Sequence, residues 1–365
     1  MQQNQVSRVT HHRLEEETAL RAARYTGEGR IEVGEAEPRT PAADEVTIRV
    51  AYNGICGTDL HIVQGHMDAR VAMPAVIGHE MSGVVEQVGA EVTGLATGAP
   101  VTVMPLRWCG ECASCLAGHQ HICQRLDFVG IDSPGALQEL WTVPASLVVP
   151  LPAGLSLQHA ALVEPLAVAV HDVRRSRLRE GETAVVIGGG PIGQLIAVVA
   201  RATGAAVILA EPDAERRAFA AAQGATVVDP IAEDLAGIVE AQTAGAGADV
   251  VFEVAGTRGT ALDATRHART RGRVVFVAIH PEPVPVDLHR IFWRELEVLG
   301  ARVYEREDFE RAVALLAEDA VPADALITRV VQLDETQTAF DALLSAAAMK
   351  ILVDVQGADE QGAER

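Results

Sequence analysis

The chain has 365 residues, a length that suggests about two domains. Its 48% hydrophobic and 22% charged residues are typical of globular rather than disordered proteins. The net charge of −20 argues against binding to nucleic acid or to an anionic membrane, because phosphate-rich surfaces would repel the chain. The five cysteines are too few for a disulfide scaffold, and their odd number would leave one unpaired.

The N-terminal segment is polar and lacks the apolar stretch of a secretory signal. We therefore interpret residues 1–18 as a polar extension and expect a cytoplasmic protein. A charge-free stretch over residues 183–200 approaches the length of a membrane span, but three glycines and Pro191 interrupt it. A strand followed by a helix explains this stretch better, so we expect no membrane interaction.

A mostly β region is predicted for residues 20–170, because short Val- and Ile-containing runs such as 45–50 and 83–88 alternate with turn signals. Within it, four cysteines follow the spacing C-x2-C-x2-C-x7-C. Four thiolates can surround one tetrahedral zinc ion and leave no open position, which predicts a structural site. An iron–sulfur cluster is the alternative, but the long fourth gap favours zinc. The candidate ligands are Cys109, Cys112, Cys115 and Cys123.

The fifth cysteine, Cys56, is followed by two further motifs with metal-binding side chains, at residues 78–80 and 163–165. Taken alone, each has a structural interpretation: a small buried thiol, a core histidine, and a carboxylate at a helix start. Together they supply a thiolate, an imidazole and carboxylates. That mixture is typical of a catalytic zinc ion, which keeps one position open. The candidate ligands are Cys56, His79, Glu80 and Glu164.

Residues 180–303 alternate short apolar runs with helix-compatible segments at 191–203 and 213–223, which predicts a parallel sheet covered by helices. Asp213 is expected to cap the second of these helices. A G-x-G-x-x-G motif after the first run predicts a dinucleotide site. Its glycines allow a tight turn, close approach to a pyrophosphate, and close helix–strand packing. The motif residues are Gly188, Gly190, Pro191, Ile192 and Gly193.

Glu211 ends the next predicted strand, where a carboxylate accepts hydrogen bonds from a ribose diol and repels a 2′-phosphate. The sequence therefore predicts NAD rather than NADP as the cofactor. Arg216 and Arg217 follow on the next predicted helix and could weaken this preference, although we interpret them as solvated side chains. Residues 304–365, with a predicted helix at 308–318 and a strand-like run at 349–355, are too short for a core of their own.

The order of these motifs resembles that of the zinc-dependent medium-chain dehydrogenases, in the sorbitol, butanediol and threonine dehydrogenase branch. The resemblance covers about residues 20–355 and implies an α/β fold, with a doubly wound Rossmann domain inserted in a GroES-like, mostly β catalytic domain. The implied division has a catalytic domain with the structural zinc lobe at 19–171, an NAD-binding domain at 172–303, and a return to the catalytic domain at 304–365.

The resemblance also implies roles for individual residues. Cys56 and His79 are zinc ligands, and Glu80 and Glu164 are the carboxylates at the zinc, either directly or through a water. Thr58 hydrogen-bonds the substrate oxygen, Asp59 orients the ligand histidine, His61 relays a proton towards solvent, and Val254 and Ile279 meet the nicotinamide side of the cofactor.

The implied activity is hydride transfer between a secondary alcohol, diol or polyol and NAD(H), with one catalytic and one structural zinc ion per chain. L-threonine 3-dehydrogenase-like activity is an alternative, but Leu106 stands where those enzymes carry a histidine, and Met104 stands where the butanediol branch usually has a glutamate. A zinc-free quinone or enoyl reductase and a non-catalytic NAD-binding zinc protein are two further possibilities. The resemblance also implies a small-molecule substrate and a homodimer or homotetramer.

Overall fold

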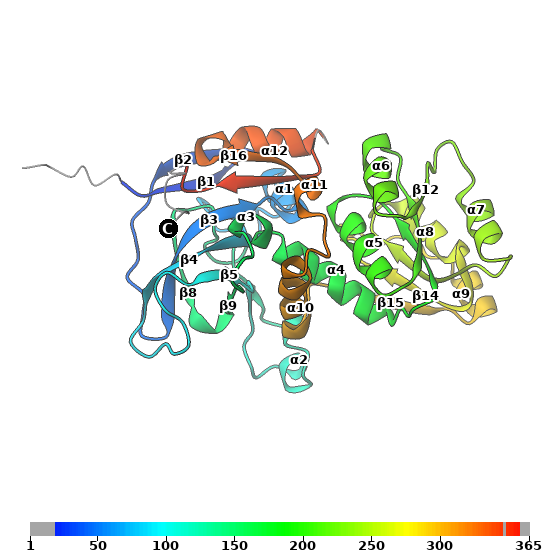
Figure 1. Ribbon diagram of the computed structural model, residues 1–365, viewed down its shortest axis with the longest axis horizontal. Helices are drawn as coiled ribbons and strands as arrows, with labels where there is room; N and C mark the ends of the chain where they lie inside the picture. Colours follow the sequence, from blue (N-terminus) through cyan, green and yellow to red (C-terminus); the bar gives the residue numbers. More distant parts are fainter. Residues whose placement is uncertain (1–18, 346–347, 358–365) are drawn as a thin grey trace, which may run out of the picture.

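The structure, a computed structural model, describes residues 19–345 and 348–357. The polar extension expected at residues 1–18 lies outside the described residues. Figure 1 shows two lobes, with helix α4 (Val163–Ser176) between them. Within the described part of the chain, no helix combines the length and the apolar character that crossing a lipid bilayer would require.

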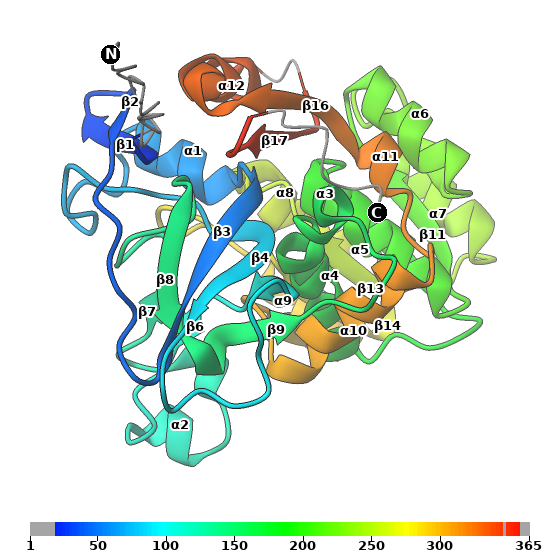
Figure 2. The same ribbon diagram turned by 60° about the vertical axis from the view of Figure 1, so that its left-hand side comes forward.

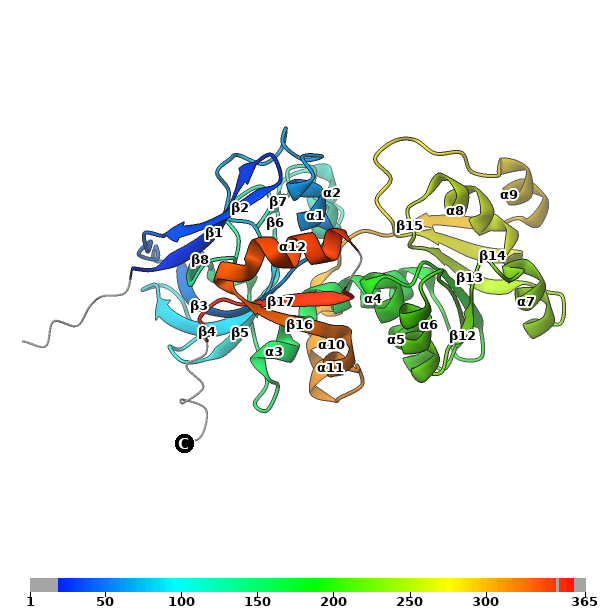
Figure 3. The same cartoon turned by 90° about the horizontal axis from the view of Figure 1, so that it is seen from above.

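A seven-stranded, largely antiparallel sheet organises the first lobe, in the order β16-β17-β3-β4-β5-β9, with β8 also paired to β3. The two strands from the end of the chain complete this sheet, because β17 runs antiparallel to β3 with Leu352 opposite Gly54. Figure 3 shows β17 and α12 lying over this lobe. The strands are β3 Glu45–Gly54, β4 Glu80–Val88, β5 Pro100–Val103, β8 Leu140–Pro144, β9 Val148–Pro150, β16 Ile327–Gln332 and β17 Lys350–Asp354.

Smaller elements surround this sheet, including two two-stranded ladders, β1–β2 and β6–β7. Their strands are β1 Arg21–Gly27, β2 Arg30–Glu35, β6 Leu106–Arg107 and β7 Asp127–Phe128. Figure 2 shows α2 projecting from the bottom of this lobe, in the cysteine-rich segment. The helices of this lobe are α1 Gly57–Val63, α2 Ala113–Leu116, α3 Leu157–Ala160, α10 Arg306–Ala317, α11 Ala323–Leu326 and α12 Thr336–Leu344.

A six-stranded parallel sheet forms the second lobe, in the order β12-β11-β10-β13-β14-β15. Its strands are β10 Thr183–Ile187, β11 Ala206–Ala210, β12 Thr226–Val228, β13 Ala248–Glu253, β14 Ala268–Phe276 and β15 Glu297–Gly300. Its helices are α5 Pro191–Ala202, α6 Ala214–Ala222, α7 Leu235–Gln242, α8 Arg258–Asp263 and α9 Leu288–Arg294.

Both faces of the parallel sheet are buried, and β10 shows this directly. Ala184 and Val186 belong to one hydrophobic core, and the alternate residues Val185 and Ile187 belong to another. Since successive side chains of a strand point to opposite faces, helices must cover the sheet on both sides. The predicted fold class, a doubly wound Rossmann sheet combined with a mostly β lobe, is confirmed.

Helix α4 was foreseen only as one structural interpretation of Glu164, as a carboxylate at a helix start, and the domain boundary expected between residues 171 and 172 falls inside it. The helix lies between the lobes and is buried along most of its length. By contrast, Asp213 caps the solvent-facing helix α6 as predicted, because its side chain accepts from the N–H of Arg216 at 2.9 Å.

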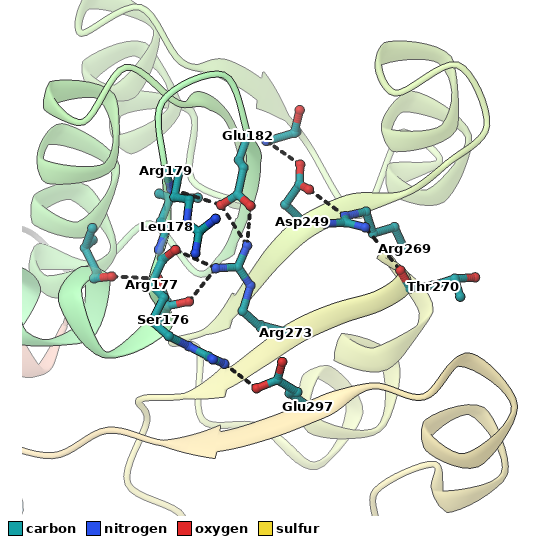
Figure 4. Close-up of polar contacts among 12 residues, drawn as sticks. Ser176, Arg177, Leu178, Arg179, Glu182, Asp249, Arg269, Thr270, Arg273 and Glu297 are labelled. Carbon is teal, nitrogen blue, oxygen red and sulfur yellow. Dashed lines mark hydrogen bonds and ion pairs between the residues drawn. The ribbon is translucent and has the colours of Figure 1, made fainter.

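One buried arginine anchors the C-terminal end of α4 to the parallel sheet (Figure 4). Arg273 of β14 donates to the carbonyl oxygens of Ser176 and Arg177 at 2.8 and 2.6 Å. It also binds both carboxylate oxygens of Glu182 at 2.7 Å. The carbonyls at a helix C-terminus carry partial negative charge, so a cation stabilises them. Helix α4 is thereby held by the second lobe at one end, while Glu164 lies in its first turn at the other.

Candidate active site and metal centres

The first candidate site begins at Cys56, the residue that caps helix α1. Its Sγ accepts from the N–H of Thr58 at 3.5 Å, and the carboxylate of Asp59 accepts from the N–H of Cys56 at 2.9 Å. This reciprocal capping box fixes the start of the short helix. The remaining oxygen of Asp59 lies 3.5 Å from Nδ1 of His79, which places a buried carboxylate behind the imidazole.

Ligand atoms of Cys56, His79 and Glu80 all lie within 4.8 Å of one another. Two separate segments supply them: the start of α1 carries Cys56, and the start of β4 carries the consecutive residues His79 and Glu80. His79 is also held by the ring of Phe128, which packs edge-on against it at 5.1 Å. The structure thus brings together three of the four predicted ligands of the first metal.

The two candidate carboxylates have different partners. Glu80 is bound by Lys350, whose Nζ lies 2.9 and 2.6 Å from its two oxygens and also donates to the carbonyl of Ile55 at 3.1 Å. Glu164 accepts from the hydroxyl of Tyr304 at 2.8 Å. All four of these side chains are buried. Glu80 belongs to the close cluster, whereas Glu164 faces it from the start of α4 and is not among the three atoms within 4.8 Å.

Neither Lys350 nor Tyr304 was singled out from the sequence. For Lys350 a signal existed, because a lysine that opens the apolar run 350–353 is expected to need a buried acidic partner. For Tyr304 no local signal existed, because its hydroxyl meets Glu164 across 140 positions of the chain.

The charges of this cluster fit a bound cation. Burial raises the pKa of the Cys56 thiol, and the neighbouring Glu80 raises it further. Burial also raises the pKa of Glu164 to about 7. Burial alone would lower the pKa of His79, but the charges of Asp59 and Cys56 raise it well above its usual value. Buried acids crowded in this way need positive charge, and thiolate, imidazole and carboxylate are the donors that zinc prefers.

The predicted relay residues lie on one face of α1. Thr58 and His61 are three residues apart, so their side chains share a helix face. Thr58 is partly buried beside Cys56, while His61 is exposed, with its Nδ1 3.4 Å from Nδ1 of His66. The arrangement leads from the buried cluster to solvent.

The second candidate site contains the four remaining cysteines in a compact group. Four of the Sγ–Sγ distances are 3.5, 3.5, 3.8 and 3.9 Å. Sulfurs at the corners of a tetrahedron with the usual Zn–S distance of about 2.3 Å stand about 3.8 Å apart. Backbone N–H groups also point at the sulfurs, including that of Arg125 at 3.3 Å from Cys123. The group therefore fits one tetrahedral ion and contains no disulfide.

The glycine motif connects β10 to α5 and opens a cavity of about 520 Å³. Gly188 has φ of +105°, which favours glycine. A Cβ on Gly193 would lie 1.9 Å from the carbonyl oxygen of Gly188, so this glycine permits close helix–strand packing. A Cβ on Gly190 would meet nothing within 4 Å, which leaves open space for a ligand at the N-terminus of α5.

Five of the nine predicted cofactor residues line this cavity, whereas Pro191, Ile192, Gly193 and Ile279 do not. Gly188, Gly190, Glu211, Arg216 and Val254 line it. Ile279 does not line it, and its side chain is 70% exposed.

Glu211 is held in place by backbone donors. Its carboxylate accepts from the N–H of Gly189 at 2.6 Å and from that of Asp213 at 2.9 Å. Arg217 points elsewhere, to the carbonyls of residues 211 and 212 and to Asp229. Arg216 is therefore the nearer of the two predicted arginines to any bound ribose, because it lines the cavity.

Comparisons with known proteins agree with this geometry. Residues 42–153 match the family model of the alcohol dehydrogenase GroES-like domain, and residues 191–318 match that of the zinc-binding dehydrogenases. The chain is 52% identical, over 87% of its length and 94% of the relative, to 2-dehydro-3-deoxy-L-galactonate 5-dehydrogenase of Pseudoalteromonas atlantica. It is 32% identical, over 90% of its length and 96% of the relative, to a sorbitol dehydrogenase of Halalkalibacterium halodurans.

A solved structure leads to the same family. A protein from Sinorhizobium meliloti described as a zinc-binding dehydrogenase, bound to NADP, superposes with a TM-score of 0.87 at 35% identity, covering 93% of this chain and all of the other. The predicted membership is confirmed, and the alternative of a non-catalytic protein falls away. This chain belongs to the zinc-dependent medium-chain dehydrogenases, and it is an oxidoreductase that uses zinc and a nicotinamide cofactor.

Proposed function

We propose that this chain transfers hydride between a secondary hydroxyl group of a polyhydroxylated small molecule and NAD. The observation that carries the proposal is the buried cluster of Cys56, His79 and Glu80, whose ligand atoms lie within 4.8 Å of one another. The names of the relatives support the substrate class, because one is a sorbitol dehydrogenase and another acts on a galactonate derivative.

The residues of the first site take distinct roles in this proposal. Cys56 and His79 hold the metal together with Glu80 or Glu164, and Asp59 orients the imidazole of His79. When bound, zinc supplies Lewis-acid polarisation of the reacting oxygen, and NAD supplies the hydride acceptor. The Thr58 hydroxyl accepts the proton from the substrate hydroxyl group and passes it towards His61 at the solvent side of α1.

We also propose a second, structural zinc ion in the four-cysteine group, so that each chain carries two. Sulfur separations near 3.8 Å and backbone N–H donors to the sulfurs support a closed thiolate site. Elemental analysis of freshly purified active protein is expected to give two zinc ions per chain. One zinc ion, or iron with acid-labile sulfide, would contradict this part of the proposal.

The preference for NAD over NADP rests on Glu211. Its carboxylate is buried and fixed by two backbone donors, so it cannot easily turn away from a 2′-phosphate. An uncompensated repulsion of about 2 kcal/mol corresponds to a preference of about 30-fold in kcat/KM. Steady-state kinetics with both cofactors measures it, and Glu211→Gln is expected to reduce the preference. Equal or better use of NADP would mean that Arg216 dominates the pocket.

A homo-oligomer is supported by the free edge of the parallel sheet. Strand β15 is the last strand of that sheet, and the adjoining helix α9 exposes large apolar side chains. An apolar edge strand is a site of association unless something covers it. These side chains are Leu288, Phe292, Trp293 and Val298, with 74%, 73%, 68% and 43% exposure. Analytical ultracentrifugation of the chain and of a Phe292→Ser, Trp293→Ser variant tests this, with a monomeric variant as the expected result.

We propose a cytoplasmic location on the basis of the cysteine chemistry. All five cysteines are free thiols, and the two proposed metal sites need them reduced.

The proposed function as a whole is tested by turnover of diols, polyols, sugar acids and L-threonine with NAD. Turnover of L-threonine alone would favour the threonine dehydrogenase alternative.

A further inference from the structure

Two arginines lie together beside the first metal site, and only one of them has a carboxylate partner among the described residues. Arg70 binds Asp132 through two bonds of 2.5 and 2.6 Å. The same carboxylate accepts from the N–H of Phe128 at 2.9 Å. Hydrogen bonds from Arg70 and Phe128 therefore engage both oxygens of Asp132.

Arg302 is the arginine without a partner. Its guanidinium forms no hydrogen bond or ion pair with any residue that the structure describes, and its side chain is open to solvent. Nevertheless the surrounding protein desolvates it, and this desolvation together with the charge of Arg70 lowers the pKa of Arg302, while Asp132 opposes the shift. The two arginines and one aspartate leave one positive charge without a partner among the described residues, and this guanidinium is accessible to an anion from solvent.

Arg302 is linked to the first metal site through the chain segment that also carries Tyr304. Tyr304, two residues later, donates its hydroxyl to Glu164 at 2.8 Å. Consecutive Cα atoms are about 3.8 Å apart, so the Cα atoms of Arg302 and Tyr304 are separated by at most roughly 7.6 Å. Between them Val303 has φ of +50°, an uncommon conformation for a β-branched residue, so the chain bends sharply at this point.

The loop that carries Asp132 reaches the same metal site from the other side. Phe128, which donates to Asp132, packs its ring against His79 at 5.1 Å. Gly130 lies so close to the segment before β4 that a Cβ on it would stand 3.1 Å from Cβ of His79. Both the loop with Asp132 and the segment with Arg302 therefore contact residues of the Cys56–His79–Glu164 site directly.

We propose that Arg302, with Arg70 beside it, binds the carboxylate of a polyhydroxy acid whose secondary hydroxyl reacts at the first metal site. This inference rests on the proposed function and narrows its substrate class from polyols to sugar acids. The planar guanidinium fork matches a carboxylate through two parallel hydrogen bonds. One unmatched positive charge suits a carboxylate monoanion better than a phosphate ester, which carries up to two negative charges. Because the segment with Tyr304 links Arg302 to the first metal site, the carboxylate at one end of the substrate binds Arg302. A secondary hydroxyl group further along the same substrate is then the group that is oxidised.

The test compares matched pairs of substrates in the zinc-loaded enzyme. A panel of hexonates and the hexitols of the same configuration is assayed with NAD, in the natural chain and in Arg302→Gln. We expect the best hexonate to exceed its hexitol in kcat/KM. Arg302→Gln is expected to lower kcat/KM for the hexonate by about 10- to 100-fold, the usual effect of a charge-assisted hydrogen bond, and to change that for the hexitol only slightly.

A binding measurement separates recognition from turnover. Calorimetric titration of the best hexonate into the enzyme–NADH complex is expected to show weaker binding for Arg302→Gln by a similar factor, and an intermediate value for Arg302→Lys, which keeps the charge but loses the fork. Arg306→Gln serves as the matched control. It removes the same charge from an arginine that pairs with Glu310 on the surface of α10, and it should leave both substrates unaffected.

The outcomes distinguish this inference from the function on which it rests. Turnover of hexitols with no advantage for hexonates, or an equal loss for both classes in Arg302→Gln, overturns the inference and leaves the proposed function standing. A hexitol phosphate that is used better than any hexonate also overturns it. If no member of the panel is oxidised although zinc and NAD are bound, the proposed function fails, and the inference fails with it.

Discussion

The two cysteine-bearing sites of this chain are assembled in opposite ways. The closed site takes its four thiolates from residues 109–123, and backbone N–H groups of the same short segment support the sulfurs. The open site takes side chains from α1, β4, α4 and β17, and its acids are balanced by Lys350 and Tyr304. A site that depends on distant segments can include a position for substrate, whereas four adjacent thiolates surround their ion completely. The difference supports the proposal that a metal in the closed site would serve stability and a metal in the open site would serve chemistry.

Removal of metal by a mild chelator should reveal the largest difference between the two sites. We expect the metal of the open site to leave first, with complete loss of activity, while the closed site keeps its ion and the fold persists. Zinc content, activity and circular dichroism measured along the same time course check this, and added zinc should restore the activity. If the two ions leave together, or if the fold is lost with the first, the two sites do not differ as argued.

Substitution of Lys350 by Met tests how far the open site depends on balanced charge. The change leaves Glu80 buried without its partner, and breaking such a buried pair costs about 3–5 kcal/mol. Thermal unfolding of the metal-free protein should therefore begin at a clearly lower temperature. The Lys350→Met, Glu80→Gln double variant is the control, because it removes both charges and should recover much of the loss. A single variant as stable as the double would contradict the argument.

Substitution of Thr58 by Val tests the proposed proton transfer at the open site. The volume is kept but the hydroxyl beside Cys56 is lost, and kcat should fall by about 100-fold or more, the usual effect of removing a positioned acid–base group. Zinc content and NAD affinity should stay unchanged. Thr58→Ser retains a hydroxyl and should keep most of the rate. Full activity of the Val variant with zinc in place would mean that the proton takes another route.

The smallest effect is expected for His61→Ala. His61 is exposed at the solvent end of α1, so water can replace it, and the loss in kcat should be less than about tenfold and depend on pH. Rates of the His61 and Thr58 variants measured across the same pH range provide the comparison. An inactive His61 variant beside a nearly normal Thr58 variant would reverse the proposed order of the relay.

Local patterns were sufficient for the features that depend on local physics. The four-cysteine spacing indicated a compact thiolate group, and the Sγ–Sγ distances near 3.8 Å agree with it. The glycine motif predicted the turn between β10 and α5, because the steric demands at Gly188 and Gly193 arise within a few residues. Asp213 was predicted as a cap because an exposed helix start needs a nearby acceptor. In each case the interaction partners are close in the sequence.

Only the tertiary structure decided which groups balance the charges of the open site. Lys350 reaches Glu80 across 270 positions and Tyr304 reaches Glu164 across 140, distances over which no local pattern extends. The same holds for the burial of helix α4 between the two lobes, because its partners, such as Arg273 at its C-terminal end, are distant in the sequence. The unmatched charge of Arg302 was equally invisible in the sequence, because it becomes unusual only when the fold brings Arg70 and Asp132, which already pair with each other, near enough to act on its charge.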